Sequence, residues 1–311
     1  MKTRPFKQVD VFTDRPYFGN PLAVVLDGSG LDDEAMQRFA RWTNLSETTF
    51  VLPPVDPAAD YRVRIFTPGG ELPFAGHPTL GSCHAWLQAG GTPRRQDFIV
   101  QECQVGLVNI RREGDRLAFA APTLQRSAPS PAVLAQVAAA LGLKAQHILA
   151  AQLLDNGPVW LGLLLDSADT VLQLAPDHAA LKKHGLKVGV AGAHPAQIAP
   201  VLIARTNREA RAFAGSMPAG AAESATADFE MRGFAAPLGI EEDPVTGSLN
   251  ASLAQWLIAE GHAPERYVAA QGTCLGRAGR VYLTRETDAA GSAQVWVGGQ
   301  SVTCINGTVA L

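Results

Sequence analysis

An internal repeat constrains the fold of this chain more than any other feature of its sequence. Three segments of the first half recur, in the same order, in the second half. The pairs are "DYRVRIFTP" (60–68) with "DFEMRGFAAP" (228–237), "FAGHPTLGSCHAWL" (74–87) with "EEDPVTGSLNASLAQWL" (241–257), and "QECQVGLVNIRREGDRLAF" (101–119) with "QGTCLGRAGRVYLTRE" (271–286). A repeat near half the chain length predicts two similar domains and an internal duplication.

The length of 311 residues also fits two domains, each large enough to bury a core. The segment 122–131, "PTLQRSAPSP", carries three prolines and two serines and is the best candidate linker. We therefore expect an N-terminal repeat domain over 1–121 and a C-terminal one over 132–311. Whether the last strand packs on the first domain stays open.

Local patterns favour an α+β fold. Short alternating or β-branched runs predict strands in "FKQVDVF" (6–12), "LAVVLDG" (22–28), "TTFVLPP" (48–54), "YRVRIF" (61–66), "GLLLD" (162–166) and "APVLIAR" (199–205). Helical spacing predicts helices in "LDDEAMQRFARWT" (31–43), "SPAVLAQVAAALGL" (130–143) and "DHAALKKHG" (177–185). We expect two pseudo-symmetric domains, each a mostly antiparallel sheet wrapped around a central helix, and a mobile loop over 215–227.

Composition excludes several classes of function. Apolar residues make up 47% and charged residues 18%, with a net charge of −3, as in a soluble globular enzyme. No basic stripe indicates nucleic-acid binding, and the longest apolar run, 159–165, is too short for a bilayer. The stretch "MKTRPFKQVDVF" has positive charge but no apolar run behind it, so we do not expect it to be a signal peptide. The four cysteines and seven histidines match no metal or disulfide motif, so we expect a cytoplasmic, reduced, metal-free protein.

The repeated loop carries the first candidate site residues. His77-Pro-x-x-Gly-Ser82 in the first copy corresponds to Asp243-Pro-x-x-Gly-Ser248 in the second. Proline is favoured at the first helical position, which predicts His77 and Asp243 at or just before two helix N-caps. Asp243 could be an ordinary capping residue, whereas histidine is a poor cap.

Two helix N-termini facing each other would form an anion site. Free N–H groups of Gly81, Ser82, Gly247 and Ser248 could bind the carboxylate of a small substrate. His77 and Asp243 would flank this substrate and could relay a proton.

Glu47, in "NLSETTFVL" (44–52), is the candidate base. A capping box from Asn44 to Glu47 and an ordinary surface glutamate are the competing interpretations, but the residues after Glu47 predict a strand, which leaves no helix to cap. The expected counterpart, "PVLIARTN" (200–207), carries no acid, and Cys83 is matched by Leu249. A single carboxylate base favours an isomerase over a two-base racemase, and burial would raise its pKa toward neutrality.

The chain resembles the phenazine-biosynthesis isomerase (PhzF-like) family, which shares the diaminopimelate epimerase fold. The resemblance rests on "VDVFTDRPYFGNPLAVV", "NLSETTFV", "FTPGGELPFAGHPTLGS", "EDPVTGS", "GRAGRVYL" and "VWVGGQSV". It implies an active site in the cleft between two domains, a homodimer, and neither a metal nor an organic cofactor.

The resemblance also assigns roles to residues. It implies that Glu47 is the catalytic acid–base, that His77, Asp243 and Ser248 bind the substrate, and that Gly76 and Gly247 are the loop glycines. The activity it implies is the isomerisation of trans-2,3-dihydro-3-hydroxyanthranilate or of another small amino or hydroxy acid. An epimerase of the same fold and a non-catalytic ligand-binding member are the alternatives.

Overall fold

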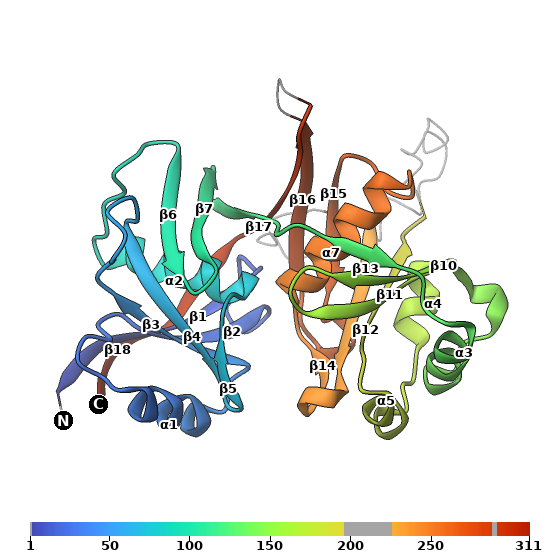
Figure 1. Cartoon of the computed structure of the whole chain (residues 1–311), viewed down its shortest axis with the longest axis horizontal. Helices are drawn as coiled ribbons and strands as arrows, with labels where there is room; N and C mark the ends of the chain where they lie inside the picture. The colour runs from blue at the N-terminus through green and yellow to red at the C-terminus, as the bar shows by residue number, and fades with distance from the viewer. Residues whose placement is uncertain (1, 196–225, 288–290) are drawn as a thin grey trace, which may run out of the picture.

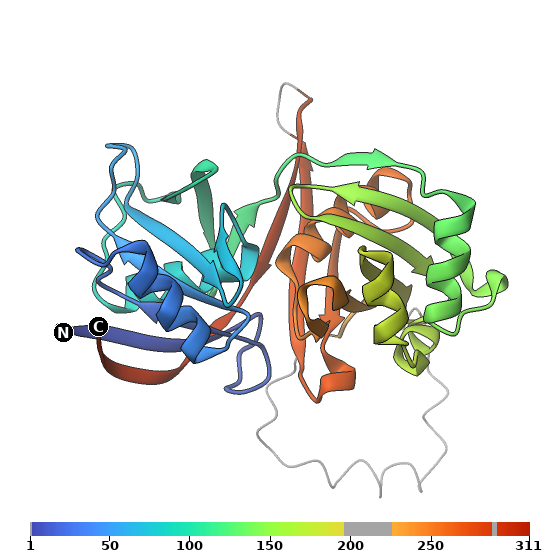
Figure 2. The same ribbon diagram turned by 60° about the horizontal axis from the view of Figure 1, so that its bottom comes forward.

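The computed structural model describes residues 2–195, 226–287 and 291–311. Two lobes lie side by side, and a long central pair of strands, β16 and β17, stands between them (Figure 1). The two ends of the chain lie close together on the first lobe in Figure 1, and also in the view turned by 60° (Figure 2). The helices of the described residues include none with the length and hydropathy of a membrane-spanning helix.

The strands of the described residues fall into two sets. The first set is β1 (Thr3–Val11), β2 (Asn20–Val25), β3 (Glu47–Leu52), β4 (Tyr61–Thr67), β5 (Gly70–Leu72), β6 (Phe98–Cys103), β7 (Gly106–Glu113), β8 (Arg116–Ala120) and β9 (Gln125–Ser127). The second set is β10 (Ile148–Asp155), β11 (Val159–Leu165), β12 (Lys187–Ala193), β13 (Phe229–Ala235), β14 (Ile240–Asp243), β15 (Arg266–Gln271), β16 (Gly279–Thr287), β17 (Ala293–Gly299) and β18 (Ser301–Ala310).

Helices connect these strands. They are α1 (Asp33–Thr43), α2 (Gly76–Gln88), α3 (Pro131–Ala140), α4 (Ala168–Gln173), α5 (His178–His184) and α7 (Gly247–Ala259), with 3₁₀ turns η1 (Ala145–His147), η3 (Ala236–Leu238) and η4 (Thr273–Leu275). The long helices α2 and α7 occupy the same place in the two strand orders, between the fifth and sixth strands of each set.

The two halves use one pairing scheme. In the first, β2 and β3 are parallel, β4 and β6 are parallel, and the other neighbours are antiparallel. In the second, β11 with β12 and β13 with β15 are the parallel pairs, and the rest again are antiparallel. The α+β class with mixed, mostly antiparallel sheet is therefore confirmed.

The halves also exchange strands. The last strand, β18, pairs with β1, and β9 pairs with β10, so each half adds its ninth strand to the other half's first. A third ladder joins β8 to β17. Since β9 lies inside 122–131, part of the expected linker is hydrogen-bonded strand.

Most local expectations are confirmed. The predicted strands within 6–66 and 162–166 and the three predicted helices all form. Asn44 ends α1 in the left-handed conformation (φ 53°), which asparagine tolerates, and the strand β3 then starts at Glu47, so the capping box does not form. The segments "APVLIAR", "PVLIARTN" and most of the loop 215–227 lie outside the described residues.

The repeated aspartates of the sequence share one structural role. The backbone N–H of Asp60 donates to Val100 O (2.8 Å), and its carboxylate accepts from Val100 N (2.7 Å). Asp228 does the same with Val268, at 2.8 and 2.7 Å. Each aspartate thus aligns the parallel strand pair that flanks its long helix.

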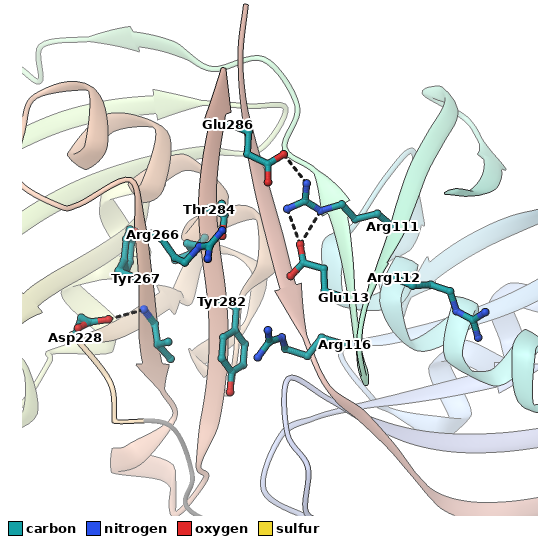
Figure 3. A pocket seen from close by; sticks show the side chains of 12 residues that line it. Arg111, Arg112, Glu113, Arg116, Asp228, Arg266, Tyr267, Tyr282, Thr284 and Glu286 are labelled. Atoms are coloured by element: carbon teal, nitrogen blue, oxygen red, sulfur yellow. Dashed lines mark hydrogen bonds and ion pairs between the residues drawn. The ribbon is translucent and has the colours of Figure 1, made fainter. Parts of the chain in front are cut away.

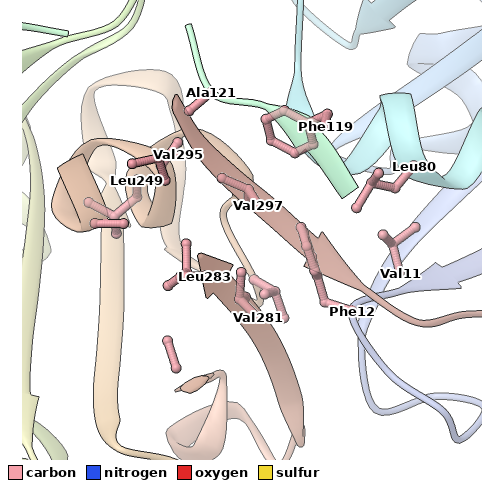
Figure 4. Close-up of a cluster of buried hydrophobic side chains, with 14 of the residues drawn as sticks. Val11, Phe12, Leu80, Phe119, Ala121, Leu249, Val281, Leu283, Val295 and Val297 are labelled. Atoms are coloured by element: carbon pink, nitrogen blue, oxygen red, sulfur yellow. The ribbon is translucent and has the colours of Figure 1, made fainter. Parts of the chain in front are cut away.

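The main hydrophobic cluster runs through both halves. Figure 4 shows its central part, where side chains of β1, α2 and β8 meet those of α7, β16 and β17 across the β8–β17 ladder. The residues that meet there include Phe12, Leu80, Phe119, Leu249, Val281 and Val297, all fully buried. The two lobes therefore share one continuous apolar core.

The N-termini of α2 and α7 meet at this junction. A Cβ added to Gly76 would lie 2.6 Å from the ring of Phe119 and 3.1 Å from Gly247 Cα. One added to Gly247 would lie 3.0 Å from Gly76 Cα. A side chain at Gly76 would require the buried Phe119 ring to move, and one at Gly247 would push the two backbones apart, so glycine is favoured where the two helices approach.

We predict that Gly76→Ala destabilises the protein by about 1–3 kcal/mol, the usual cost of overpacking a filled core. Gly70→Ala is the matched control because no atom lies within 4 Å of its added Cβ. Urea unfolding midpoints measure the difference. Equal midpoints for the two variants would contradict the packing argument.

Candidate functional site

Glu47 and His77 form the centre of the candidate site. Glu47 is the first residue of β3, and His77 lies in the first turn of α2. Glu47 Oε2 and His77 Nε2 are 3.3 Å apart, with 15% and 6% of the two side chains exposed. The approach lacks hydrogen-bond geometry, and both atoms are buried without a hydrogen-bond partner among the described residues.

Burial changes the ionisation of both groups. Loss of solvation, with a smaller effect from the Asp243 charge, raises the pKa of Glu47 to about 8. Burial lowers the pKa of His77 to about 3. The pair is therefore mostly uncharged at pH 7 and does not form an ion pair, but a carboxyl group with this pKa can both take up and release a proton near neutrality.

Asn20, at the start of β2, connects the two halves of the site. Its side-chain N–H₂ group donates to Asp243 Oδ1 (3.1 Å) and to Val245 O (2.9 Å), and it lies 3.4 Å from His77 Nδ1. Asn20 is fully buried. One amide thus links the second half's Asp243 to the first half's His77.

Asp243 is held on both carboxylate oxygens. Besides the Asn20 contact, Thr246 Oγ1 donates to Asp243 Oδ2 (2.6 Å). The Gln271 amide N–H₂ group donates to Asp243 O and to Thr246 Oγ1, both at 3.0 Å. Burial raises the pKa of Asp243, and the bonds from Thr246 and Asn20 oppose that change.

The structure corrects the register of the repeated loop. The N-caps of α2 and α7 are Ala75 and Thr246, so the prediction of a position at or just before an N-cap is wrong for His77, which follows its cap, while Asp243 precedes its cap by three residues. His77 is already the second residue of α2, whereas Asp243 ends β14, before α7 begins. The facing glycines are equivalent, which makes Ser248 the counterpart of His77.

For the same reason Ser82 does not lie at the N-terminus of α2, where the repeat predicts it. Ser82 is the seventh residue of α2, fully buried, and its Oγ donates to Thr49 Oγ1 (2.8 Å). The N–H groups available at the α2 terminus are those of Gly76 and His77, because Pro78 has none. At α7 they include those of Gly247 and Ser248.

Ser248 is positioned by the β10–β11 hairpin. Trp160 Nε1 donates to Ser248 Oγ (3.2 Å), and the Asn156 side-chain amide donates to Ser248 O (3.0 Å). The structure therefore brings together Glu47, His77, Asp243 and the two glycine termini, places Ser248 beside them, and leaves Ser82 apart.

Sequence reasoning missed the amides that organise the site. Asn20 lies in the motif "VDVFTDRPYFGNPLAVV", but nothing in a single sequence indicates that a strand-initial asparagine crosses to the other half. Gln271 begins its repeated segment as Gln101 begins the first, and both are fully buried, so the repeat itself carried a signal for this residue. Cys274 is exposed in the 3₁₀ turn η4, whereas Cys103 is buried at the end of β6.

A groove of 590 Å³ lies elsewhere, between the β7–β8 hairpin and the outer face of β15 and β16 (Figure 3). Arg111 bridges Glu113 and Glu286 there, at 2.6 and 2.7 Å. The Arg116 guanidinium lies 4.0 Å from the centre of the Tyr282 ring. None of the predicted site residues lines this groove, so it is distinct from the site around Glu47.

Comparisons with known proteins agree over most of the chain. The phenazine biosynthesis-like protein family matches residues 9–307. The chain is 34% identical to antisense-enhancing sequence 1 of Schizosaccharomyces pombe, with 99% of each chain covered. It is 33% identical to trans-2,3-dihydro-3-hydroxyanthranilate isomerase of Pseudomonas aeruginosa, with 89% of each covered.

A solved structure is similar throughout as well. The phenazine biosynthesis protein of the PhzF family from Bacillus anthracis has a TM-score of 0.79 at 22% identity, with all of both chains covered. The matched residues 9–307 include Glu47, His77 and Asp243 and the N-termini of α2 and α7. The chain therefore belongs to the phenazine biosynthesis-like, or PhzF, family.

Proposed function

We propose that this protein is a cofactor-independent isomerase in which Glu47 shifts a proton between two positions of a small unsaturated carboxylic acid. The observation that supports this most is that the carboxyl groups of Glu47 and Asp243 differ in their hydrogen bonding. Glu47 Oε2 is buried without a hydrogen-bond partner, whereas both oxygens of Asp243 accept hydrogen bonds from Asn20 and Thr246. Glu47 is free to exchange a proton, and Asp243 is suited to hold a substrate.

The proposed reaction needs one group on one face of the substrate. Ionised Glu47 removes a proton from a carbon atom, and the electron pair delocalises into the adjacent unsaturated system. The same carboxylic acid then returns the proton at the other end of that system, so no electrons are gained or lost. With a pKa of about 8, about a tenth of Glu47 is ionised at pH 7.

A substrate carboxylate would bind between the helix termini. The N–H groups of Gly76 and His77 on α2 and of Gly247 and Ser248 on α7 have no partner within their helices. Two positive dipole ends favour an anion between them. His77, neutral at pH 7, and Asp243 would contact the remaining polar groups of the substrate.

The substrate class comes from relatives. The chain is 33% identical to a trans-2,3-dihydro-3-hydroxyanthranilate isomerase of Pseudomonas aeruginosa and 31% identical to one of Pseudomonas fluorescens. We propose that compound, or a similar cyclic amino or hydroxy acid, as the substrate. A two-base epimerisation is less well supported, because Asp243 is fixed by its donors and the α2 N-cap is Ala75, which cannot carry a proton.

We predict that Glu47→Gln lowers kcat for trans-2,3-dihydro-3-hydroxyanthranilate by about 10²–10⁴-fold, the usual contribution of a general acid–base, while ligand binding persists. Proton NMR in D₂O would follow the product and the carbon that acquires deuterium. Glu34→Gln, whose side chain is 82% exposed on α1, is the control. Turnover by Glu47→Gln at the wild-type rate would exclude Glu47 as the base. If neither the wild type nor Glu34→Gln turned the compound over, it would be excluded as the substrate.

The pH profile gives a second prediction. Because the first step needs ionised Glu47, kcat/KM should rise with pH and level off above about 8. The charge of Asp243 raises the pKa of Glu47, so Asp243→Asn should move this bend to lower pH, whatever it does to the maximal rate. An unchanged bend, or one moved upward, would contradict the assignment.

A further inference from the structure

Directly behind the site lies a buried ion pair that the proposed reaction does not use. Arg232 donates from Nε and Nη2 to the two carboxylate oxygens of Glu242, at 3.0 and 2.7 Å. Only 6% and 7% of these side chains are exposed. Arg232 Nη1 also donates to Val171 O and Leu174 O at the end of α4, at 3.2 and 2.8 Å. The guanidinium lies 5.1 Å from the centre of the Phe234 ring.

The position of this pair relative to Asp243 is fixed by strand geometry. Arg232 lies on β13 and Glu242 on β14, and the next residues along, Gly233 and Asp243, are paired across the two strands. Side chains alternate between the faces of a strand. The side chains of Arg232 and Glu242 therefore lie on the face of the β13–β14 hairpin that contacts α4. Asp243 projects from the other face toward Asn20.

The first half carries the same arrangement. Arg64 donates from Nε and Nη2 to both oxygens of Glu71, at 2.7 and 2.6 Å, and lies 5.1 Å from the centre of the Phe66 ring. Its Nη1 donates to Asp33 on α1 (2.7 Å). The residue after Glu71, however, is the apolar Leu72, which takes the place of Asp243.

We propose that Arg232, through its two-point contact with Glu242, is the positioning residue that holds Asp243 against Asn20 and beside the Glu47–His77 pair. The proposal rests on the function proposed above. A bidentate guanidinium fixes both the distance and the orientation of a carboxylate, which a lysine ammonium does not. Glu242 precedes Asp243 directly, so fixing one residue fixes the backbone of the other.

The Arg64–Glu71 pair of the first half allows a positioning role of Arg232 to be distinguished from ordinary stabilisation. Both pairs tie a hairpin to a neighbouring helix, and both contact an aromatic ring. Only the second pair adjoins an ionisable site residue. If both pairs merely stabilise their hairpins, removing either should affect the site equally. If Arg232 positions Asp243, the two removals should differ.

The test uses two charge-neutral double variants, Arg232→Met with Glu242→Leu and Arg64→Met with Glu71→Leu. Each removes one positive and one negative group, and buried ion pairs are often replaced by apolar residues without loss of folding. The readout is the ¹³C NMR titration of the Glu47 carboxyl group, assigned with Glu47→Gln. This measurement needs no turnover, so it remains decisive even if the proposed substrate fails.

We expect the Arg232/Glu242 variant to lower the titration midpoint of Glu47 by about one pH unit, because Asp243 then moves away from it. The Arg64/Glu71 variant should leave that midpoint unchanged and keep kcat within about twofold of wild type. Arg232→Lys, which keeps the charge but loses the fork geometry, should move the midpoint in the same direction and covers the case in which the double variant fails to fold. An unchanged midpoint in folded Arg232 variants, or equal shifts from both pairs, would overturn the proposal.

Discussion

The approach of two helix N-termini, with Gly76 and Gly247 in contact, is the constraint on which the rest of the site depends. Each terminus carries about half a positive charge and N–H groups that its own helix cannot satisfy. Bringing two such ends together in a buried junction is unfavourable unless negative charge lies near. Glu47, with a pKa of about 8, supplies little negative charge at pH 7. The carboxylate of Asp243 supplies part of it, but both of its oxygens already accept hydrogen bonds from Asn20 and Thr246. A carboxylate on the substrate would supply the rest, in line with the small acids proposed as substrates.

The fold was more predictable than the site, and the reason lies in what each depends on. Strands and helices such as 61–66 and 31–43 follow from local periodicity, and the segment repeat revealed the common plan of the halves. The loop repeat misled, because His77-Pro-x-x-Gly-Ser82 and Asp243-Pro-x-x-Gly-Ser248 are similar in sequence but do not occupy equivalent positions in space. The reliable anchors were Gly76 and Gly247, whose backbones make the helix contact.

With the register corrected, a symmetric framework carries asymmetric chemistry. His77 corresponds to Ser248, and Asp243 corresponds to Leu72. Glu47 begins β3, whereas the corresponding strand β12 begins with Lys187. No carboxyl or imidazole group of the site therefore has a group of the same kind at the equivalent position of the other half. A reaction that removes and returns a proton on one face needs this asymmetry, since two equivalent carboxyls would compete for the same proton and separate their pKa values.

The connection between the halves limits how such a site can open. A free linker over 122–131 would let two domains swing apart, but β9 lies in that segment and pairs with β10. The β1–β18 and β8–β17 ladders also cross between the halves, so complete separation would break main-chain hydrogen bonds as well as the shared core. Asn20, by contrast, contacts Asp243 and Val245 through a single amide group. Close to Asn20, main-chain hydrogen bonds from Ala278 N to Phe18 O and from Arg280 N to Phe12 O, both 2.8 Å, also join the halves. Substrate entry that breaks none of these bonds is therefore limited to movement of side chains around Glu47 and His77.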